Sequence, residues 1–276
     1  MYHKGYVEAL PIQLPEVTEL IREYFKSHYN HNYICEHKHK LVAEFIEGFV
    51  PWLNQGHLKF KGLKDFKNVY ITNGVTEFIQ IVIPDHNLRP ITHHKKEYSA
   101  YKAHAGEYIK SGVKLDNKVD VISLPFCRTA DIHPKTCEIL DKPSLVDLAW
   151  AGNSGIEETF DLSKVSYATF SFSKCFGVHY HRIGLTFSKE PIPTLELEKG
   201  FNYVNLVSME LMKFIMSRMS PSYLYDKYKD IAHKFCVEND LEPTKSLWMG
   251  LKDGDRKSLL EYWMNYLNEN RKPRVS

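Results

Sequence analysis

The sequence predicts an α/β protein in which a mostly parallel sheet lies between two layers of helices, with a reduced helical domain beside it. Between residues 69 and 188, short β-rich runs alternate with helical segments, an order typical of parallel sheets. Most of these runs are apolar without strict alternation, as expected of strands that are covered on both faces. Towards both ends of the chain, apolar residues recur at three- and four-residue spacing, which indicates helices.

The individual elements follow from these periods. We expect helices over residues 15–29 and 37–50, and strands in the runs NVYIT, RPITHH, VDVISLP, PSLVDLAW, VSYATFSF and RIGLTFS. Further helices are expected over residues 205–219, 220–239 and 255–270, the second of them capped by Ser220 or Ser222. The chain then divides into an N-terminal helical segment of a small lobe (1–48), an α/β domain (49–205) and a C-terminal helical lobe (206–276).

The composition argues against several classes of function. The 276 residues include 36 Lys and Arg against 34 Asp and Glu, so the near-zero net charge of +2 gives no electrostatic basis for nucleic-acid binding. The apolar runs are too short to cross a bilayer, and the N-terminus lacks the apolar core of a signal peptide. Five cysteines without a C-x-x-C pair suit a reducing compartment. We therefore expect a soluble cytoplasmic protein.

A phosphate site is predicted where the run YIT ends. Gly74 follows this strand, and a helix begins at about Val75 and Thr76. Backbone N–H groups at a helix start bind phosphate well when a small residue allows close approach. Most turns in which a glycine joins a strand to a helix bind no ligand, so this turn predicts a phosphate site only in combination with further motifs.

Asp147 and Lys174 lie at the ends of two further predicted strands and add to the predicted phosphate site. Asp147 follows an apolar strand, where a buried carboxylate needs a cationic or hydrogen-bonding partner, although a helix cap or a surface ion pair would also explain it. Lys174 follows the run VSYATF between Ser171 and Arg182, both of which can face a phosphate. A phosphate cup, a carboxylate and a lysine, in this order, are the parts that hold pyridoxal phosphate.

The motifs resemble those of a known family. The segment SFSKCFGVHYHRIG fits the lysine motif S-x-S-K-x-F-G followed by R-x-G of the fold-type-I pyridoxal-phosphate enzymes, specifically the class I/II aminotransferases. TNGVTE is similar to the family's phosphate cup, VDLAWAG to its D-x-A-Y strand end, and EYSAYKAHAGEYIKSG to the segment whose first aromatic residue, here Tyr98, stacks on the cofactor ring. The resemblance runs from about residue 69 to residue 188.

The resemblance implies a pyridoxal-phosphate-dependent aminotransferase that acts on a small molecule. Lys174 would hold the cofactor as a Schiff base and move protons, and Asp147 would keep the ring nitrogen protonated. Gly74, Val75, Thr76, Ser171 and Arg182 would hold the phosphate. The family also implies a homodimer, in which Tyr29 or Tyr33 would reach the phosphate of the neighbouring subunit.

The sequence departs from the family's pattern at three places. Cys127 aligns with an asparagine, and Trp150 with a tyrosine, that both donate hydrogen bonds to the ring oxygen of the cofactor. The chain also ends where the family continues to a late arginine that grips the substrate carboxylate, as in a shortened member; Arg128 and Arg274 are candidates to replace it. We expect weak turnover of common amino acids. The alternatives are a degenerate homologue that binds cofactor or phosphate without efficient transamination, and an unrelated phosphate-binding α/β protein.

A cluster of histidines and a cysteine near the N-terminus does not predict a metal site. Its spacing differs from the paired ligands of closed zinc sites, so we expect a solvated helix start and no metal. The cluster consists of His28, His31, Cys35, His37 and His39.

Overall fold

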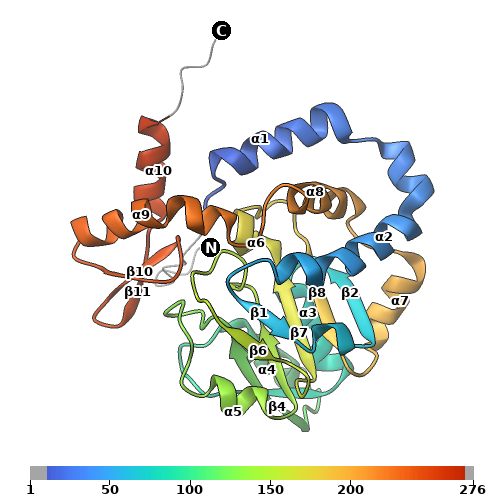
Figure 1. Ribbon diagram of the computed structural model, residues 1–276. Helices are drawn as coiled ribbons and strands as arrows, with labels where there is room; N and C mark the ends of the chain where they lie inside the picture. Colours follow the sequence, from blue (N-terminus) through green and yellow to red (C-terminus); the bar gives the residue numbers. More distant parts are fainter. Residues whose placement is uncertain (1–10, 271–276) are drawn as a thin grey trace.

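A six-stranded sheet forms the centre of the computed structural model, which describes residues 11–270 (Figure 1). Its strand order is β2-β8-β7-β5-β4-β3. All neighbours from β7 to β3 are parallel, and β8 runs antiparallel to both β2 and β7. The predicted mostly parallel sheet is therefore confirmed. The strands are β2 (Asn68–Thr72), β3 (Leu88–Thr92), β4 (Asn117–Ser123), β5 (Ser144–Asp147), β7 (Tyr167–Ser171) and β8 (Gly184–Ser188).

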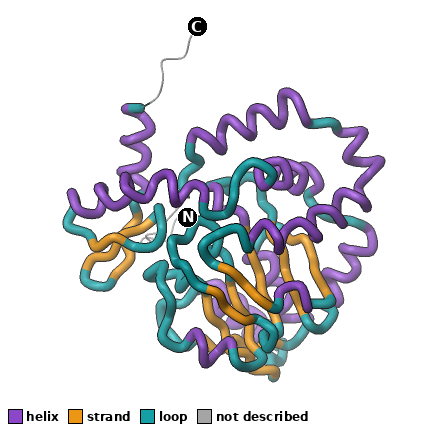
Figure 2. Tube along the Cα trace, viewed as in Figure 1, coloured by secondary structure: helices purple, strands orange, loops and turns teal. Residues whose placement is uncertain are grey.

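Helices cover both faces of this sheet (Figure 2). Successive side chains of a strand point to opposite faces, so Leu145 packs in one core with α3, α4 and α7, whereas Val146 packs in the other with α2, α5 and α8. This arrangement confirms the three-layer prediction. The helices are α2 (His31–Leu53), α3 (Val75–Asp85), α4 (Ala100–Lys110), α5 (Thr136–Leu140), α7 (Pro193–Phe201) and α8 (Leu206–Met216).

The N-terminal part of the described chain is helical, as predicted. Helix α1 (Pro15–Glu23) continues through a single π-helical turn (Tyr24–His28) towards α2, which Asn30 caps by accepting a hydrogen bond from the N–H of Tyr33. A short parallel pair, β1 (Lys59–Lys61) and β6 (Thr159–Asp161), lies outside the central sheet. No helix within residues 11–270 is long and apolar enough to span a membrane.

The C-terminal part of the described chain contains a small sheet that the sequence analysis missed. Between α9 (Tyr223–Glu238) and α10 (Leu260–Glu269) lie three antiparallel strands, β9 (Glu242–Pro243), β10 (Met249–Lys252) and β11 (Asp255–Ser258). The prediction of a helix over residues 255–270 was therefore wrong at its start, where β11 stands in place of the first helical turn. Asp253 and Gly254 both have positive φ, which forms the two-residue hairpin turn between β10 and β11.

The serine that precedes α9 does not cap this helix in the way that the sequence predicted. Ser222 precedes α9, but its hydroxyl makes no cap hydrogen bond and accepts one from the N–H of His57, at 2.9 Å. Ser222 therefore connects the start of α9 with the loop after α2.

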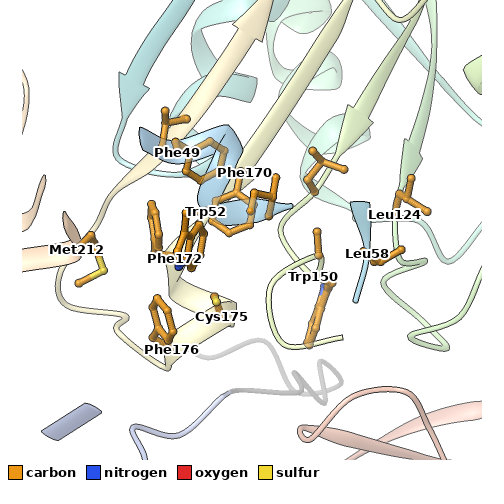
Figure 3. Close-up of a cluster of buried hydrophobic side chains, with 14 of the residues drawn as sticks. Phe49, Trp52, Leu58, Leu124, Trp150, Phe170, Phe172, Cys175, Phe176 and Met212 are labelled. Atoms are coloured by element: carbon orange, nitrogen blue, oxygen red, sulfur yellow. The ribbon is translucent and has the colours of Figure 1, made fainter. Parts of the chain in front are cut away.

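An aromatic core fixes the short helix α6 (Phe172–Phe176), which follows β7 directly (Figure 3). Phe172 and Phe176 are buried, and the ring centroid of Phe172 lies 5.4 Å from that of Trp52 on α2. Burial of one such side chain stabilises a fold by about 1.5–3 kcal/mol. The packing of both phenylalanines holds α6 in place, and with it the one residue of this helix that is not buried, Lys174.

Candidate functional site

The predicted site residues meet at one edge of the sheet. Thr72 at the end of β2 and Ser171 at the end of β7 both pair with Gly184 at the start of β8. Asp147 ends β5 and pairs with Thr169 of β7. The carboxyl ends of β2, β5 and β7 therefore open onto one place, where α/β sheets commonly bind ligands.

Gly74, Ser171 and Arg182 meet at this edge, and we call these three residues the phosphate cradle. The φ of +93° and ψ of −177° of Gly74 define a conformation that is essentially restricted to glycine. A Cβ atom at this position would lie 3.1 Å from Ser171 Oγ and 3.2 Å from Arg182 Nη2. Gly74, Ser171 and Arg182, which come from three different segments, are thus in close contact around one small volume.

Polar groups surround this cradle. The hydroxyl of Ser171 accepts a hydrogen bond from the N–H of Ser173 (3.3 Å), and Nη1 of Arg182 donates to the Ser173 hydroxyl (3.3 Å). The first N–H groups of α3, those of Val75 and Thr76, have no carbonyl partner within the helix. Because the Val75 side chain is buried in the core, Val75 offers only its backbone here.

Lys174 lies next to the cradle on α6. The sequence predicted it at a strand end; the strand stops at Ser171, and one helical turn follows. Its Nζ lies 5.1 Å from the ring centroid of Trp150, within the range of a cation–π contact. Its carbonyl oxygen accepts a hydrogen bond from Trp248 Nε1 at 3.1 Å. Side chain and backbone of Lys174 are therefore both held by tryptophans.

Asp147 is a buried carboxylate, with only 2% of its surface exposed. Oδ1 accepts from the N–H of Ala149 at 2.9 Å, and Oδ2 accepts from the Tyr101 hydroxyl at 3.1 Å. Burial raises the pKa of Asp147 to about 7, and the negative charge of Glu97 adds to this rise, whereas both hydrogen bonds and the charge of Lys174 oppose it. Among residues 11–270, Asp147 is in no ion pair.

Two tyrosines, Tyr98 before α4 and Tyr101 within it, have rings in contact, and Tyr101 is the one that contacts Asp147. Tyr98 is 38% exposed, its hydroxyl lies 3.4 Å from that of Thr76, and its ring meets the ring of Tyr101 edge to face, 6.1 Å between centroids. Tyr101 is fully buried. The sequence analysis named Tyr98 and missed Tyr101, although a spacing of three residues at a helix start places both side chains on one face.

Glu97 is a second buried carboxylate that the sequence analysis missed. It accepts hydrogen bonds from the hydroxyl and the N–H of Ser123, at 2.5 and 3.1 Å, and from the N–H of Tyr98, at 2.9 Å. The thiol of Cys127 donates to the same carboxylate at 3.3 Å, and burial raises the pKa of this thiol. Cys127 is thus a protonated donor that is directed to Glu97.

Comparison with solved structures identifies the fold. The chain superimposes on the pyridoxal-phosphate-bound C-S lyase from Staphylococcus hominis (TM-score 0.60, 11% identity, 98% of this chain and 82% of that one). It also superimposes on tyrosine aminotransferase from Leishmania infantum (TM-score 0.56, 13% identity, 95% of this chain and 82% of that one). The third structure is substrate-bound BacF from Bacillus subtilis (TM-score 0.59, 14% identity, 96% of this chain and 79% of that one). The chain has the fold of the fold-type-I pyridoxal-phosphate enzymes. No family model and no curated protein matches the sequence.

On this fold-type-I framework, the β10–β11 hairpin forms one wall of the site. Trp248, just before β10, reaches Lys174, and Nη1 of Arg256 on β11 donates to the carbonyl oxygen of Cys127 at 3.0 Å. Asp255 on β11 forms ion pairs with Lys96 and, at 3.1 Å, with Arg128. Of the two arginines that the sequence proposed for a substrate carboxylate, Arg128 therefore pairs with this hairpin, and Arg274 lies outside the described residues.

The remaining predicted residues lie elsewhere in the chain. Tyr29 and Tyr33 are exposed, at 38% and 44%, between the π-helical turn and the first turn of α2, and Tyr33 stacks on His37 with ring centroids 4.3 Å apart. Across residues 11–270, no three His, Cys, Asp or Glu side chains are grouped as a metal site would require.

Proposed function

We propose that the protein is a pyridoxal-phosphate-dependent enzyme that transfers an amino group between small molecules, with the cofactor held on Lys174 through an imine. In this reaction an amine donor becomes a carbonyl compound and a carbonyl acceptor becomes an amine. The observation that carries the proposal is the buried carboxylate of Asp147, which has no ion-pair partner within residues 11–270, next to Lys174. A buried carboxylate calls for a positive partner, and a protonated pyridine nitrogen is one.

The residues present fit this cofactor. The absence of a side chain at Gly74 leaves a space that Ser171, Ser173 and Arg182 surround with donors, as a phosphate requires. The half-exposed ring of Tyr98 stands at the edge of the same site, where an aromatic face can cover a flat ring. The likeness to solved structures at 11–14% identity, of which the C-S lyase is cofactor-bound, supports the fold on which these residues are arranged.

Each side chain then has a chemical task. When bound, pyridoxal phosphate supplies an electron-accepting ring conjugated to the amino group. Asp147 would hold a proton at the ring nitrogen, and Tyr101 and the N–H of Ala149 orient its two oxygens. Lys174 Nζ would move a proton at the amino carbon of the substrate. Trp150 keeps this amine at one side of the site.

The second candidate is a homologue that binds the cofactor without efficient transamination. The observation that favours it is the environment of Cys127, whose thiol donates to Glu97 and is thereby directed away from any ligand oxygen. The family donor at this position is an asparagine, so one contact to the ring oxygen would be missing.

Borohydride reduction tests the proposed function. We expect the purified protein, reconstituted with pyridoxal phosphate, to lose its visible absorbance on reduction and to carry a phosphopyridoxyl group on the peptide that contains Lys174. Lys174→Ala should abolish the adduct, whereas the exposed Lys189→Ala should retain it. An adduct on another lysine, or none, would contradict the assignment. Loss of absorbance on adding a panel of amine donors, both L-amino acids and amines without a carboxylate, separates an active transaminase from the second candidate.

We further propose a two-fold symmetric homodimer, as the resemblance implies. Tyr29 and Tyr33 are exposed, and a second copy of the chain could cover either of them. Sedimentation equilibrium with cofactor at micromolar concentration should give twice the 32.2 kDa mass of the chain. A single species at the monomer mass would contradict this proposal.

A further inference from the structure

Glu97 is a second buried carboxylate at the edge of the sheet where Asp147 lies. It is 7% exposed, and no ion pair within residues 11–270 includes it. Ser123, at the end of β4, donates to Glu97 and is the register partner of Asp147 on β5. Register partners direct their side chains to the same face of a sheet, here the face that packs against α4. The two carboxylates are therefore held at adjacent strand ends on one face.

The hydrogen bonds of Glu97 indicate an ionised carboxylate. Oε1 accepts from the hydroxyl of Ser123, the N–H of Tyr98 and the thiol of Cys127, and Oε2 accepts from the N–H of Ser123. The Ser123 hydroxyl itself accepts from the N–H of Cys127 at 3.0 Å, so its own proton is directed to Glu97. A protonated carboxyl would have to donate a hydrogen bond, whereas an ionised one only accepts. Glu97 therefore carries a negative charge inside the protein.

This charge acts on Asp147. Burial raises the pKa of Asp147 to about 7, and the negative charge of Glu97 adds to the rise. The groups that oppose it are the N–H of Ala149, the hydroxyl of Tyr101 on α4 and the positive charge of Lys174 on α6. In the cofactor-free protein, Asp147 therefore keeps a proton at pH values at which Glu97 is ionised.

Within the described chain, the titratable groups around Glu97 do not neutralise it. The thiol of Cys127 stays protonated, because burial and the charge of Glu97 both raise its pKa. His133, in the segment before α5, is uncharged at neutral pH, because burial lowers the pKa of its imidazole. Lys96, which precedes Glu97, is paired with Asp255. The site thus holds one uncompensated negative charge beside a protonated Asp147.

We propose that Glu97 is a positioning residue of the cofactor site: its carboxylate aligns Tyr98 with the end of β4, and its charge keeps a proton at Asp147 until the ring nitrogen of the cofactor receives it. The inference rests on the proposed function. In this step the O–H bond of Asp147 breaks and an N–H bond forms at the ring nitrogen, so no further reactant is needed. Two ionised carboxylates then stabilise the positive ring nitrogen, where Asp147 alone would supply one.

A purely structural Glu97 predicts a different result of one substitution. If Glu97 only fastens Tyr98 to β4, Glu97→Gln lowers stability and leaves the titration of Asp147 where it is. If its charge acts on Asp147, the same change lowers the pH at which Asp147 ionises, since the like charge that opposes ionisation is gone. The titration of Asp147 therefore separates the two explanations.

NMR titration of the cofactor-free protein, with isotope-labelled aspartate carboxyl carbons, provides the measurement. Asp147→Asn identifies the resonance of Asp147 by its loss. We expect this resonance to titrate at a pH of about 7 in the wild type and about one pH unit lower in Glu97→Gln. Glu97→Met also removes the charge and should give the same shift. It keeps the test valid if the first variant fails to fold, as thermal melting would reveal.

Two further variants separate the charge of Glu97 from its fit. Glu97→Asp keeps the charge on a shorter side chain, so we expect lower stability but a titration of Asp147 that stays near the wild-type pH. Asp120→Asn removes another carboxylate from β4, one that pairs with Lys142 at 2.8 Å, and should leave the titration of Asp147 unchanged.

The role at the ring nitrogen is tested with the deaza analogue of pyridoxal phosphate, in which carbon replaces this nitrogen. Above the pH at which Asp147 ionises, Glu97→Gln should weaken the binding of pyridoxal phosphate about tenfold, measured by quenching of tryptophan fluorescence. The analogue has no nitrogen to hold the proton, so its affinity should change by less than about twofold.

The inference is overturned if Asp147 titrates at the wild-type pH in the folded neutral variants of Glu97, or if the cofactor and its analogue lose affinity equally. Because the NMR titration uses no cofactor, a lowered midpoint in protein that gives no borohydride adduct would refute the proposed function and leave the coupling of the two carboxylates standing. An adduct on Lys174 with an unchanged midpoint would refute the role of Glu97 and leave the proposed function standing.

Discussion

The hydroxyl of Tyr101 donates a 3.1 Å hydrogen bond to Oδ2 of Asp147, and both side chains are buried. The bond crosses from α4 to the end of β5 and fixes the carboxylate at the edge of the sheet. Burial raises the pKa of the Tyr101 hydroxyl, and the charge of Asp147 raises it further, so the tyrosine stays protonated and remains a donor.

Tyr101→Phe should therefore weaken the hold on Asp147. A buried carboxylate that loses one of two donors is destabilised by about 1–3 kcal/mol, and its pKa rises further. We expect a lower urea midpoint and a weaker affinity for pyridoxal phosphate, measured by quenching of tryptophan fluorescence. Tyr108→Phe removes a hydroxyl from the same helix, one that donates to Gln80 O near the surface, and should affect stability only slightly. Equal effects of both variants would contradict the role of Tyr101.

The raised pKa of Asp147 predicts how stability varies with pH in the cofactor-free protein. The folded state holds this proton up to a pH of about 7, whereas the unfolded chain releases it near the ordinary value of 3.8. Between these pH values the folded state binds more protons, so stability falls as the pH rises. Between pH 5 and 7 the loss should be about 2 kcal/mol.

Asp147→Asn should remove most of this loss, as urea unfolding at both pH values would show. Bound cofactor should oppose the loss in the wild type, because a protonated ring nitrogen stabilises the ionised carboxylate. A wild-type stability that does not change from pH 5 to 7 without cofactor would contradict the raised pKa.

These two predictions rest on contacts that only partly follow from the sequence. The three layers, the strand positions and the meeting of Gly74, Asp147 and Ser171 were predictable, because periodicity and strand ends are local features of the chain. Tyr101 and Glu97 were missed, since their significance depends on partners in β4 and β5 that sequence spacing does not reveal.

The hairpin was missed for a different reason. The strand β11 is the run DRKS, which has no apolar residue and therefore no strand-like alternation, so it was assigned to the polar start of the last helix, and the turn signal at Asp253 and Gly254 was not used. Arg256 was consequently placed on a helix and was not considered as a site residue. Its contact with Cys127 joins residues that are 129 positions apart.

Gly74→Ala should damage the phosphate cradle. The new Cβ would crowd Ser171 Oγ and Arg182 Nη2 and would stand in a conformation that alanine avoids. We expect a loss of about 1–3 kcal/mol in stability and a fall of about tenfold or more in affinity for pyridoxal phosphate. The affinity for pyridoxal, which lacks the phosphate, should fall less.

Gly106→Ala is the matched control. Gly106 lies in α4 with open space around its Cβ position, so alanine there should be neutral or stabilising by up to about 1 kcal/mol. Should Gly74→Ala bind the cofactor as tightly as Gly106→Ala does, the cradle would not be the phosphate site.

The double variant Cys127→Asn/Trp150→Tyr should lower the pH at which the visible band of the cofactor-loaded protein shifts. Both new side chains can donate to the ring oxygen, and a hydrogen bond to a charged group contributes about 1.5–3 kcal/mol. We therefore expect a shift of about one pH unit or more, which an absorbance titration would measure. Each single variant, measured in parallel, shows which donor is responsible. A band that titrates at the same or a higher pH in the double variant would refute this explanation.

The contacts of Trp248 and Arg256 have a consequence for the order in which the protein is made. Synthesis proceeds from the N-terminus, and folding follows it. Gly74, Ser171 and Arg182 leave the ribosome before either of these two residues, so the phosphate cradle can assemble while the wall beside Lys174 is still missing. The nascent chain therefore passes through a stage in which the carbonyl oxygen of Lys174 still lacks the hydrogen bond from Trp248 and that of Cys127 the one from Arg256, and synthesis of the last segment supplies both.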